Sequence, residues 1–509
     1  MENSLPGKEY KFRTDEAKDG SMTLLVSVDG KEQPFHSRVA PAREASDPAP
    51  DPEKYDLVIV LGCGLGYGLL PMKENLHNYG KVIIIDILSG IEEDIPRNPV
   101  TGFLAAPNVM FITGMAPGEI EMILAETINF DELKGIHVRE HATSFKIFPA
   151  YYSEVKSAVK RVLDRKASGA ATVKAFGRRF LRNALFNLDN MASMKPVASL
   201  SGRFSGYRGL VVSSAPSIEE HIGDIAAHRD SFVLIAVDSA VPLLEKNNIV
   251  PDLAVSIDPQ QRINEHFLGH EGSRTAHVFS IVSPAETVKK YGGYIFLNSH
   301  PVAQVIESIY PGLTGSIDSS TGSVAGDALA LALLCGFDSI AMAGFDFSFT
   351  HNAIYARGTA YQQRYSTMFS TRLRTPESFN AEYIFRASRG FMEKGRYTRR
   401  SFTGYRDSLG AYIQRSCPGR ICWISSGLVP AGVKPVNFRE FMDRPVQFEK
   451  AGNTRDIICN ETGSACAIDP VKIKNFITQP HIWDQLIKES IGDLQGRDYS
   501  ELKEMLKHH

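Results

Sequence analysis

The stretch 340–349 constrains the fold more than any other part of this sequence. It reads Ile-Ala-Met-Ala-Gly-Phe-Asp-Phe-Ser-Phe, an apolar run that ends in a glycine and a lone aspartate. A continuous apolar run is typical of a strand buried in a parallel sheet, and ligands of such sheets lie just outside the carboxyl ends of the strands. Gly344 would let a ligand approach the backbone, and Asp346 would stand at the rim of the site.

A helix and a polar turn precede this strand. The run Val324–Cys335 is helix-like, and the turn Ser319-Ser320-Thr321-Gly322-Ser323 opens it. A turn, a helix, a strand and an acid in this order predict a nucleotide or sugar-nucleotide site.

The bulk composition bounds the class of protein. The chain has 509 residues, which predicts two to four domains, and 43% hydrophobic with 22% charged residues, which predicts a globular protein. A formal net charge of −2 argues against a general nucleic-acid binder. Residues 1–18 do not read as a signal peptide, and no window has the 18–20 apolar residues, roughly, that a membrane span needs. The six cysteines form no CxxC pair, so we expect no zinc site, a reducing compartment and a cytoplasmic location.

The first half of the chain has a hairpin followed by an α/β unit. Residues 24–28 and 33–35 flank Asp29-Gly30, a strong two-residue turn signal. A Pro- and Ala-rich linker, 41–52, follows. Four strands are then expected, at Leu57–Leu61, 82–85, Val109–Thr113 and 135–138. We interpret residues 151–191 as a connecting pair of helices.

A second α/β series begins near residue 209. Its expected strands are 210–212, 232–237, 253–257, 278–282, 294–297 and 340–343, and a last strand at 421–425 would rejoin the sheet. Residues 351–407 are rich in Arg and Tyr and poor in acids. From about residue 436 the chain reads as charged helices.

The predicted fold class is therefore α/β, with two Rossmann-like domains in tandem and a helical C-terminal region. We expect a hairpin and linker over 1–50, a first Rossmann-like domain over 51–150 and a helical connector over 151–205. The central domain would span 206–432, with residues 351–407 inserted, and the helical region 433–509.

The glycine-rich loop 62–68 offers one candidate site. Its glycines allow a tight turn whose helix would favour an anion. Tyr67 stands where a dinucleotide fingerprint has its last glycine, and Asp86 ends the next strand, which is more typical of a methyltransferase. A purely structural turn that binds nothing is an equal alternative.

The second candidate site gathers small polar residues from several strand ends and helix openings. Each residue could simply cap a helix, but together they predict one ligand site. The members are Ser214, Ser217, Asp238, Ser239, Asp258, Thr321, Gly322, Ser323, Gly344 and Asp346.

Two further features lie next to this set. His351 could act as a general base, although a solvated histidine is the simpler interpretation. The Arg- and Tyr-rich segment could bind an anionic donor, act as a lid, or form a plain surface loop. Nucleic-acid binding is a further option that the neutral overall charge disfavours.

Motifs in a fixed order resemble the motility accessory factor family, the cytoplasmic flagellin glycosyltransferases of bacteria. They are His-Ser-Arg-Val-Ala-Pro-Ala-Arg-Glu-Ala at 36–45, Val-Leu-Gly-Cys-Gly-Leu-Gly-Tyr at 60–67, Arg-Asn-Ala-Leu-Phe-Asn-Leu at 182–188, Ala-Pro-Ser-Ile at 215–218, Ile-Val-Pro-Asp at 249–252, Ser-Ile-Asp-Pro at 256–259 and Gly-Ser-Val at 322–324.

The central domain of that family is similar to bacterial sialyltransferases, and the resemblance implies a chemistry. It implies inverting transfer, without an obligatory metal or other cofactor, of a pseudaminic- or legionaminic-type nonulosonic acid from a CMP donor to Ser or Thr of flagellin, with no nucleic acid or membrane as partner. Ser214, Asp238 and the Thr321–Ser323 turn would face the nucleotide.

The same resemblance assigns the catalytic end of the site. Residues 344–347 match the Gly-Ile-Asp-Phe strand end of those enzymes, so Asp346 would be catalytic, with His351 as the nearest candidate base. Ser348 replaces their phosphate-binding tyrosine, and Tyr355 or Tyr361 is the candidate substitute.

Three other functions compete with this one. A 6-hydroxymethylpterin pyrophosphokinase-like enzyme predicts a dependence on ATP and magnesium. An N-terminal methyltransferase predicts adenosylmethionine at the glycine loop. A non-catalytic flagellin-binding factor predicts binding without turnover.

Overall fold

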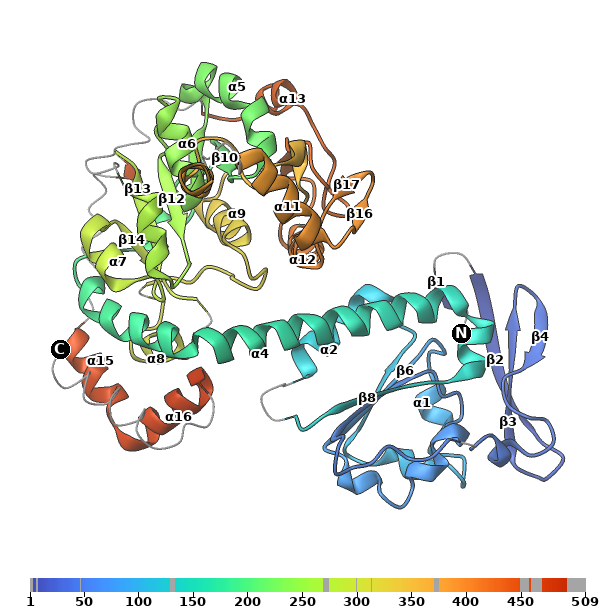
Figure 1. Ribbon diagram of the computed structural model, residues 1–509. Coiled ribbons are helices and arrows are strands. Elements are labelled where there is room, and N and C mark those ends of the chain that lie inside the picture. Colours follow the sequence, from blue (N-terminus) through green and yellow to red (C-terminus); the bar gives the residue numbers. More distant parts are fainter. Residues whose placement is uncertain are drawn as a thin grey trace. The chain divides into compact units, whose positions relative to one another are not determined.

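The computed structural model describes residues 3–5, 8–45, 47–128, 133–268, 274–298, 300–312, 314–369, 375–448, 457–458 and 469–491 (Figure 1). The chain divides into two compact units, Met1–Thr172 and Val173–His509, which are described one at a time. Of the six cysteines, Cys459 and Cys466 lie outside the described residues. The other four are buried free thiols: Cys63, Cys335, Cys417 and Cys422.

The first unit is built on a parallel sheet. Its order is β7-β6-β5-β8, with β5 at Leu57–Leu61, β6 at Lys81–Asp86, β7 at Val109–Thr113 and β8 at Ile136–Glu140. All residues of β5 are buried, as the continuous apolar run predicts. The four predicted strands are confirmed.

An antiparallel sheet precedes it, with the order β1 (Asn3–Leu5), β2 (Lys8–Glu16), β3 (Met22–Val28) and β4 (Lys31–Pro34). Asp29 and Gly30 join β3 to β4 with φ angles of 50° and 78°. Positive φ at both residues matches the right-handed strand twist, so the predicted hairpin is confirmed.

One helix, α4 (Pro149–Met191), replaces the predicted pair of helices, and that prediction is wrong. After Pro149 this stretch has no proline and only two glycines, so nothing forces a turn. Near its start, Val155 and Val159 are buried in the core of the first unit. Near its end, Leu181 and Leu188 are buried in the core of the second unit.

The second unit holds an eight-stranded sheet in which every pairing is parallel. Its order is β18-β15-β10-β11-β12-β13-β14-β9. The strands are β9 (Lys195–Pro196), β10 (Arg208–Val212), β11 (Val233–Val237), β12 (Leu253–Ser256), β13 (Ala276–Ser280), β14 (Tyr294–Phe296), β15 (Ser339–Ala343) and β18 (Ile421–Trp423). The predicted fold class, α/β with parallel sheets and C-terminal helices, is confirmed.

The strand order reverses at β10, which lies between β11 and the much later β15. Such a reversal leaves a crevice outside the carboxyl ends of the two diverging strands, where open α/β sheets bind ligands. The helix α9 (Val324–Cys335) packs against β10, β11 and β12 and is buried almost all round (Figure 1). The other α-helices between β10 and β15 in the chain are α5 (Ile222–Ala227), α6 (Val241–Lys246), α7 (Ala285–Tyr291) and α8 (Pro301–Ile309).

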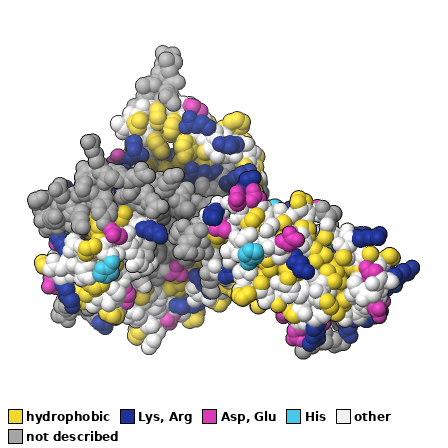
Figure 2. All heavy atoms as spheres, turned by 90° about the horizontal axis from the view of Figure 1, so that it is seen from below, with side chains coloured by type: hydrophobic (Ala, Val, Ile, Leu, Met, Phe, Trp, Pro, Cys, Tyr) yellow, Lys and Arg dark blue, Asp and Glu magenta, His cyan; other side chains and the backbone are white. Residues whose placement is uncertain are grey.

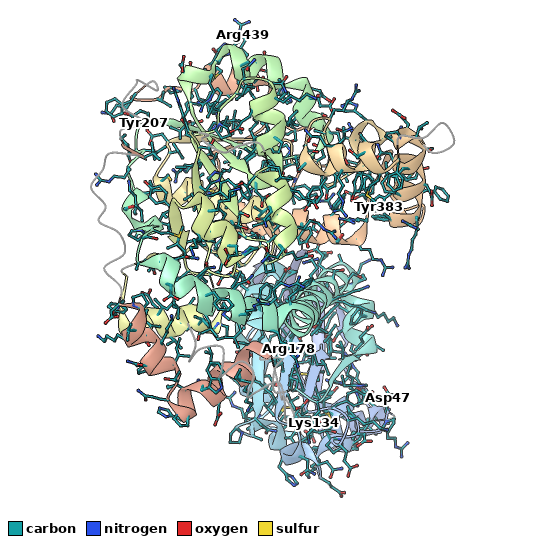
Figure 3. All side chains as sticks on the ribbon, turned by 60° about the vertical axis from the view of Figure 1, so that its left-hand side comes forward. Asp47, Lys134, Arg178, Tyr207, Tyr383 and Arg439 are labelled. Carbon is teal, nitrogen blue, oxygen red and sulfur yellow. The ribbon has the colours of Figure 1, made fainter. Side chains whose placement is uncertain are left out.

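The inserted segment is mainly helical. It comprises α10 (Ala360–Met368), α11 (Pro376–Ser388), the hairpin β16 (Met392–Glu393) and β17 (Arg396–Tyr397), and the start of α12 (Arg400–Ser416). Its aromatic residues pack on one another. Tyr365 and Phe369 both contact Phe379, and Tyr383 accepts a hydrogen bond from Arg399 (Figure 3). The segment is therefore an ordered subdomain, where the surface-loop alternative expected an exposed loop.

Beyond the sheet lie α13 (Phe438–Met442), α15 (Pro470–Ile477) and α16 (Pro480–Ile491). The helices predicted from about residue 436 are confirmed within the described residues, and residues 492–509 lie outside them. No helix in the described ranges combines the length and apolarity needed to span a membrane. On the face shown in Figure 2, basic side chains are interspersed with acidic ones.

Candidate functional site

The carboxyl ends of β10 and β15 meet closely at the switch point. Ser213 N donates to Ala343 O at 2.9 Å, and Ala215 N donates to Gly344 O at 3.2 Å. Gly344 has φ of 75°, and a Cβ there would collide with the Ser213 carbonyl. The glycine therefore serves a close approach of protein backbone to protein backbone.

Asp346 follows directly and is buried. One carboxylate oxygen accepts from Ser217 N at 3.0 Å and the other from Ser217 Oγ, while the Asp346 carbonyl accepts from Leu428 N at 2.6 Å. Burial raises the pKa of Asp346, and the Ser217 hydrogen bonds offset part of that rise. This acid anchors the turn Pro216–Glu220, which follows β10.

The ends of β11 and β12 carry a second polar cluster. Ser256 Oγ donates to Asp238 Oδ2 at 2.7 Å, and Ser239 N donates to Asp238 Oδ1 at 2.7 Å. Ser239 Oγ in turn donates to Ser214 Oγ at 2.9 Å. The structure thus brings Ser214, Asp238 and Ser239 together, as the sequence pattern predicts.

His266 completes this cluster, although no sequence motif marked it. Its ring is buried, and Nδ1 lies 3.4 Å from Asp238 Oδ1. Burial disfavours the charged ring, but the Asp238 carboxylate outweighs burial and raises the pKa of His266. Burial tends to raise the pKa of Asp238, but His266 outweighs it and lowers that pKa. Asp258, which accepts from Gln260 N at 2.8 Å, has its pKa raised, mainly by burial and also by the Asp238 charge.

Two tyrosines of the insert cover His266. The rings of His266 and Tyr361 meet edge to face at 4.9 Å, and Tyr355 stacks on Tyr361 at 4.6 Å. Ala356 N donates to Ser214 O at 3.0 Å, which ties this segment to the end of β10. Burial raises the pKa of Tyr355 to about 12 and raises that of Tyr361 as well, so both hydroxyls keep their protons.

The turn before α9 and the first turn of α9 each hold one buried polar atom that has no hydrogen-bond partner among the described residues. Ser323 Oγ caps the helix by accepting from Gly326 N at 3.3 Å. Thr321 Oγ1 and Asp327 Oδ1 are buried, and neither has a hydrogen-bond partner among the described residues. A Cβ at position 326 would collide with the Thr321 side chain. Such unsatisfied groups are rare in folded proteins and are typical of places where a ligand binds.

Asp327 has an unusual titration for its position. Its other oxygen accepts from Ser319 Oγ at 2.9 Å, and burial raises the pKa of Asp327 to about 7. The carboxyl group is therefore largely neutral below neutral pH, which removes a negative charge from the first turn of α9.

His351 lies apart from the Asp238–His266 pair. Its side chain is 55% exposed, and Nε2 is 2.7 Å from Glu220 Oε1, which also accepts from Ser426 Oγ. Phe347, His351 and Asn352 all have φ near +50°, a strained conformation for residues with a side chain. His351 thus interacts with the turn after β10 and is open to solvent.

The glycine loop of the first unit is filled by protein. Asp86 Oδ2 accepts from Cys63 N at 2.7 Å and from Gly64 N at 2.9 Å, so the carboxylate stands where a bound anion would. A Cβ at Gly64 would collide with Phe35 and His36. The helical stretch expected after the loop consists of short 3-10 helices at Tyr67–Met72 and Leu76–Asn78, with no α-helix among the described residues between the loop and β6. These features favour the structural-turn alternative over a cofactor site.

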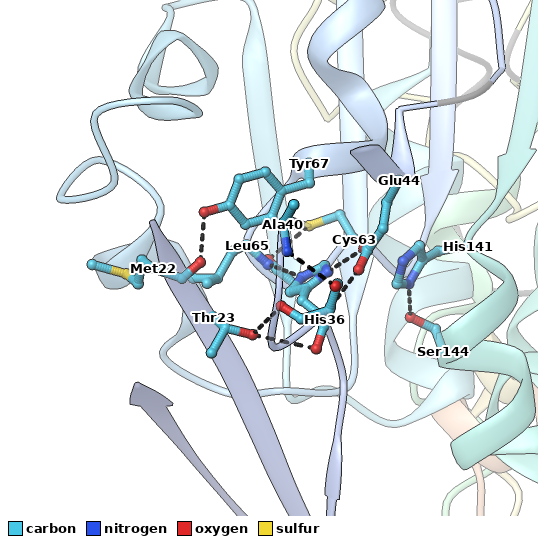
Figure 4. A network of polar contacts seen from close by, with 12 residues as sticks. Met22, Thr23, His36, Ala40, Glu44, Cys63, Leu65, Tyr67, His141 and Ser144 are labelled. Atoms are coloured by element: carbon cyan, nitrogen blue, oxygen red, sulfur yellow. Dashed lines mark hydrogen bonds and ion pairs between the residues drawn. The ribbon is translucent and has the colours of Figure 1, made fainter. Parts of the chain in front are cut away.

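His36, Glu44 and His141 form a compact cluster at this loop, shown in Figure 4, with candidate ligand atoms within 4.8 Å of one another. Leu65 N donates to His36 Nε2 at 2.9 Å, so the ring hydrogen is on Nδ1, which donates to Glu44 at 2.6 Å. Both nitrogens of His36 are therefore engaged. The cluster fastens the hairpin to the loop and does not fit a metal ion as it stands.

Three comparisons bear on the fold and its relatives. The family described as 6-hydroxymethylpterin diphosphokinase MptE-like matches residues 182–352. An uncharacterized protein of Treponema pallidum (strain Nichols) is 34% identical over 85 residues, or 17% of this chain and 40% of that protein's length. The structure of MAf glycosyltransferase from Magnetospirillum magneticum AMB-1 aligns over 95% of this chain and 76% of that one, with a TM-score of 0.54 and 14% identity.

The name of that solved structure, MAf glycosyltransferase, agrees with the family that the sequence motifs resemble. The structural likeness covers nearly the whole chain, and at 14% identity it shows a shared fold. The family match begins in the second half of α4 and ends beside His351, so it takes in every polar cluster of the switch point.

Replacing Gly64 tests whether the glycine loop is structural. Gly64→Ala places a Cβ about 2.7 Å from Phe35 at φ of 52°, so we expect a loss of at least about 2 kcal/mol in unfolding free energy. Gly68→Ala is the matched control, because nothing lies within 4 Å of its added Cβ. Calorimetry of the full chain measures both, and equal melting curves for the two variants would contradict the structural role.

Asp327→Asn tests the buried carboxyl. The folded chain holds this proton to a higher pH than the unfolded chain, so stability is full below about pH 4 and falls as pH rises toward 7. At about 1.4 kcal/mol per pKa unit, we expect Asn to stabilise the chain by about 2 kcal/mol more at pH 8 than at pH 5. Urea unfolding at both pH values checks this, and a gain that does not change with pH would refute it.

Proposed function

We propose that this chain is a glycosyltransferase that moves a pseudaminic- or legionaminic-type nonulosonic acid from a CMP donor to Ser or Thr of flagellin. The observation that carries the proposal is the set of buried polar atoms without partners, among the described residues, at the carboxyl edge of the second sheet. Thr321 Oγ1 and His266 Nε2 belong to this set. The motif order supports the reaction class, and the fold likeness to a glycosyltransferase is consistent with it.

The chemical character of the edge suits an anionic donor. Asp346 and Asp238 are occupied by donors of the protein itself. The groups left without a partner from the protein are the Thr321 hydroxyl and the start of the 12-residue helix α9. The dipole of α9 favours a phosphate at that end. Asp327, in the first turn, opposes that charge only when it ionises near pH 7.

The leaving group would be stabilised by hydrogen-bond donors. In the transition state the bond between the anomeric carbon and the phosphate oxygen breaks, and negative charge gathers on CMP. Tyr355 and Tyr361 stay protonated because burial raises the pKa of both, so either hydroxyl can donate to that phosphate. Preorganised donors of this kind each contribute roughly 10²–10³ in rate. The reaction then needs no metal, and Asp346 serves by holding the Ser217 turn.

One observation favours a second function. The description of the matching family names a pterin diphosphokinase. Transfer of diphosphate from ATP would require magnesium, whereas the proposed sugar transfer continues in a chelator. The two functions are therefore separated by one addition to the same assay.

Sugar transfer is tested with purified flagellin and CMP-pseudaminic or CMP-legionaminic acid, with and without EDTA. We expect an intact-mass gain of one sugar residue per site in both conditions. Thr321→Val keeps the side-chain shape and removes the hydroxyl, and we expect transfer to fall at least about tenfold. Ser308→Ala is the control, because Ser308 is exposed and bonds only to Val305 O of its own helix.

Three results would count against the proposal. Flagellin of unchanged mass with both donors excludes the transfer. Consumption of ATP with a hydroxymethylpterin, abolished by EDTA, favours the diphosphokinase. Binding of flagellin with no chemistry on either substrate favours a binding factor.

A further inference from the structure

His266 and Asp238 form a buried pair of ionisable side chains in the second unit. The ring is 2% exposed, yet neither nitrogen makes a hydrogen bond with the described residues. The contact of Nδ1 with Asp238 Oδ1, at 3.4 Å, is an ion-pair distance. Buried polar atoms normally find partners, and groups left without them mark functional places. A histidine kept in this state needs a reason other than packing.

Asp238 is held so that it faces this ring. Ser256 Oγ occupies Oδ2, and Ser239 N shares Oδ1 with His266. Both serines come from the ends of parallel strands, so the carboxylate cannot turn away without breaking two hydrogen bonds. The negative charge of Asp238, 3.4 Å from Nδ1, favours the tautomer that carries its hydrogen on Nδ1, which leaves the lone pair on Nε2. This is the tautomer that a general base requires.

The surroundings complete the case. Three acidic side chains act on His266: Asp238, Asp258 and Glu265, which precedes His266 in the chain. The Tyr361 ring packs against the His266 ring. Three carboxylates near one imidazole favour the imidazolium that forms when Nε2 takes a proton. His351, by contrast, is exposed and its Nε2 is engaged by Glu220.

A groove lies beside the turn that carries His266. It has a volume of about 760 Å³ and lies between α6, the turn Gln261–His266 and α10. Its lining includes Glu265, Leu268, Arg364 and Met368, and Arg364 contacts Glu265 at 3.6 Å. Tyr361 is on α10 and packs edge to face on the His266 ring, between the end of the second sheet and the helix that lines this groove.

We propose that His266 is the catalytic base of the transfer, with Asp238 as its positioning residue; this rests on the proposed glycosyltransferase function. The acceptor O–H proton goes to His266 Nε2 as the acceptor oxygen bonds to the anomeric carbon. The bond from that carbon to the CMP phosphate oxygen breaks, and its electron pair leaves with CMP. The proton passes from His266 to water after release.

The test compares variants in the flagellin transfer assay, together with CMP binding by calorimetry and a thermal melt. His266→Gln is expected to lower kcat by about 10²–10⁴ and to change CMP affinity less than threefold. Asp238→Asn removes the facing carboxylate, so the rising limb of the kcat/KM pH profile moves to lower pH. His351→Gln is the rival variant, and His228→Gln, at an exposed helix end, is the control.

Rescue separates chemistry from structure. His266→Ala leaves a ring-sized space, and added imidazole should restore at least about tenfold of the lost rate, which repair of folding alone would not produce. If the His266 variants do not fold, the Asp238→Asn pH profile decides alone, and an unmoved limb overturns the proposal.

The outcomes distinguish this inference from the proposed function. Wild-type protein that transfers neither sugar overturns both. Wild-type protein that transfers sugar, with His266→Gln within threefold of it, overturns only the base assignment. Loss of rate in His351→Gln with His266→Gln unaffected assigns the base to His351.

Discussion

The position of β10 between β11 and β15 is the constraint on which the rest of the second unit depends. It reverses the strand order and brings residues more than one hundred positions apart to one crevice. Ser217 and Asp346 meet there only because Val212 pairs with Ala343 in the parallel register. A shift of that register by one residue would turn each strand's side chains to opposite faces. The hydrophobic core around α9 fixes the register and therefore the site.

The two units share one structural device. In each, an aspartate at or just after the end of a strand accepts hydrogen bonds from the turn that follows the neighbouring strand. Asp86 binds Cys63 and Gly64, and Asp346 binds Ser217. An aspartate at the end of a parallel strand reads as a ligand contact, but its nearest donors are the backbone N–H groups of the adjacent turn. Burying a carboxylate requires such donors, so the protein's own turn satisfies it before any ligand does.

This explains which features could be predicted from the sequence. Continuous apolar runs located the central strands of both parallel sheets, because burial on two faces leaves no polar positions. The two-residue edge strand β9 was not predicted, since it has no such run. The meeting of Ser214, Asp238 and Ser239 also followed, since parallel strands end at one edge. The unbroken helix α4 was missed because polar periodicity alone cannot tell one helix from two.

His266 could not be found from the sequence, because it belongs to a short turn without periodicity and depends on a fold that brings α10 over it. His351 stood nearer to the acid in sequence, but its backbone, in a left-handed conformation, holds it beside Glu220. Nearness to Asp346 in the sequence therefore did not predict which histidine lies beside an aspartate at the end of the sheet.

Local preference, packing and polar satisfaction agree over most of the second unit. Some exceptions lie beside the candidate site, and others lie elsewhere, for example at Arg208, Trp423 and Asn248. Thr321, Asp327 and His266 leave polar atoms unsatisfied, and Phe347, His351 and Asn352 hold a strained backbone. Each such feature costs stability, of order 1–3 kcal/mol, and nothing in the packing of the sheet requires it. Folded proteins retain such costs where function needs them. The unpaired atoms of Thr321, Asp327 and His266 contrast with the glycine loop of the first unit, which the protein's own side chains fill, and this contrast favours the second sheet as the place of the chemistry.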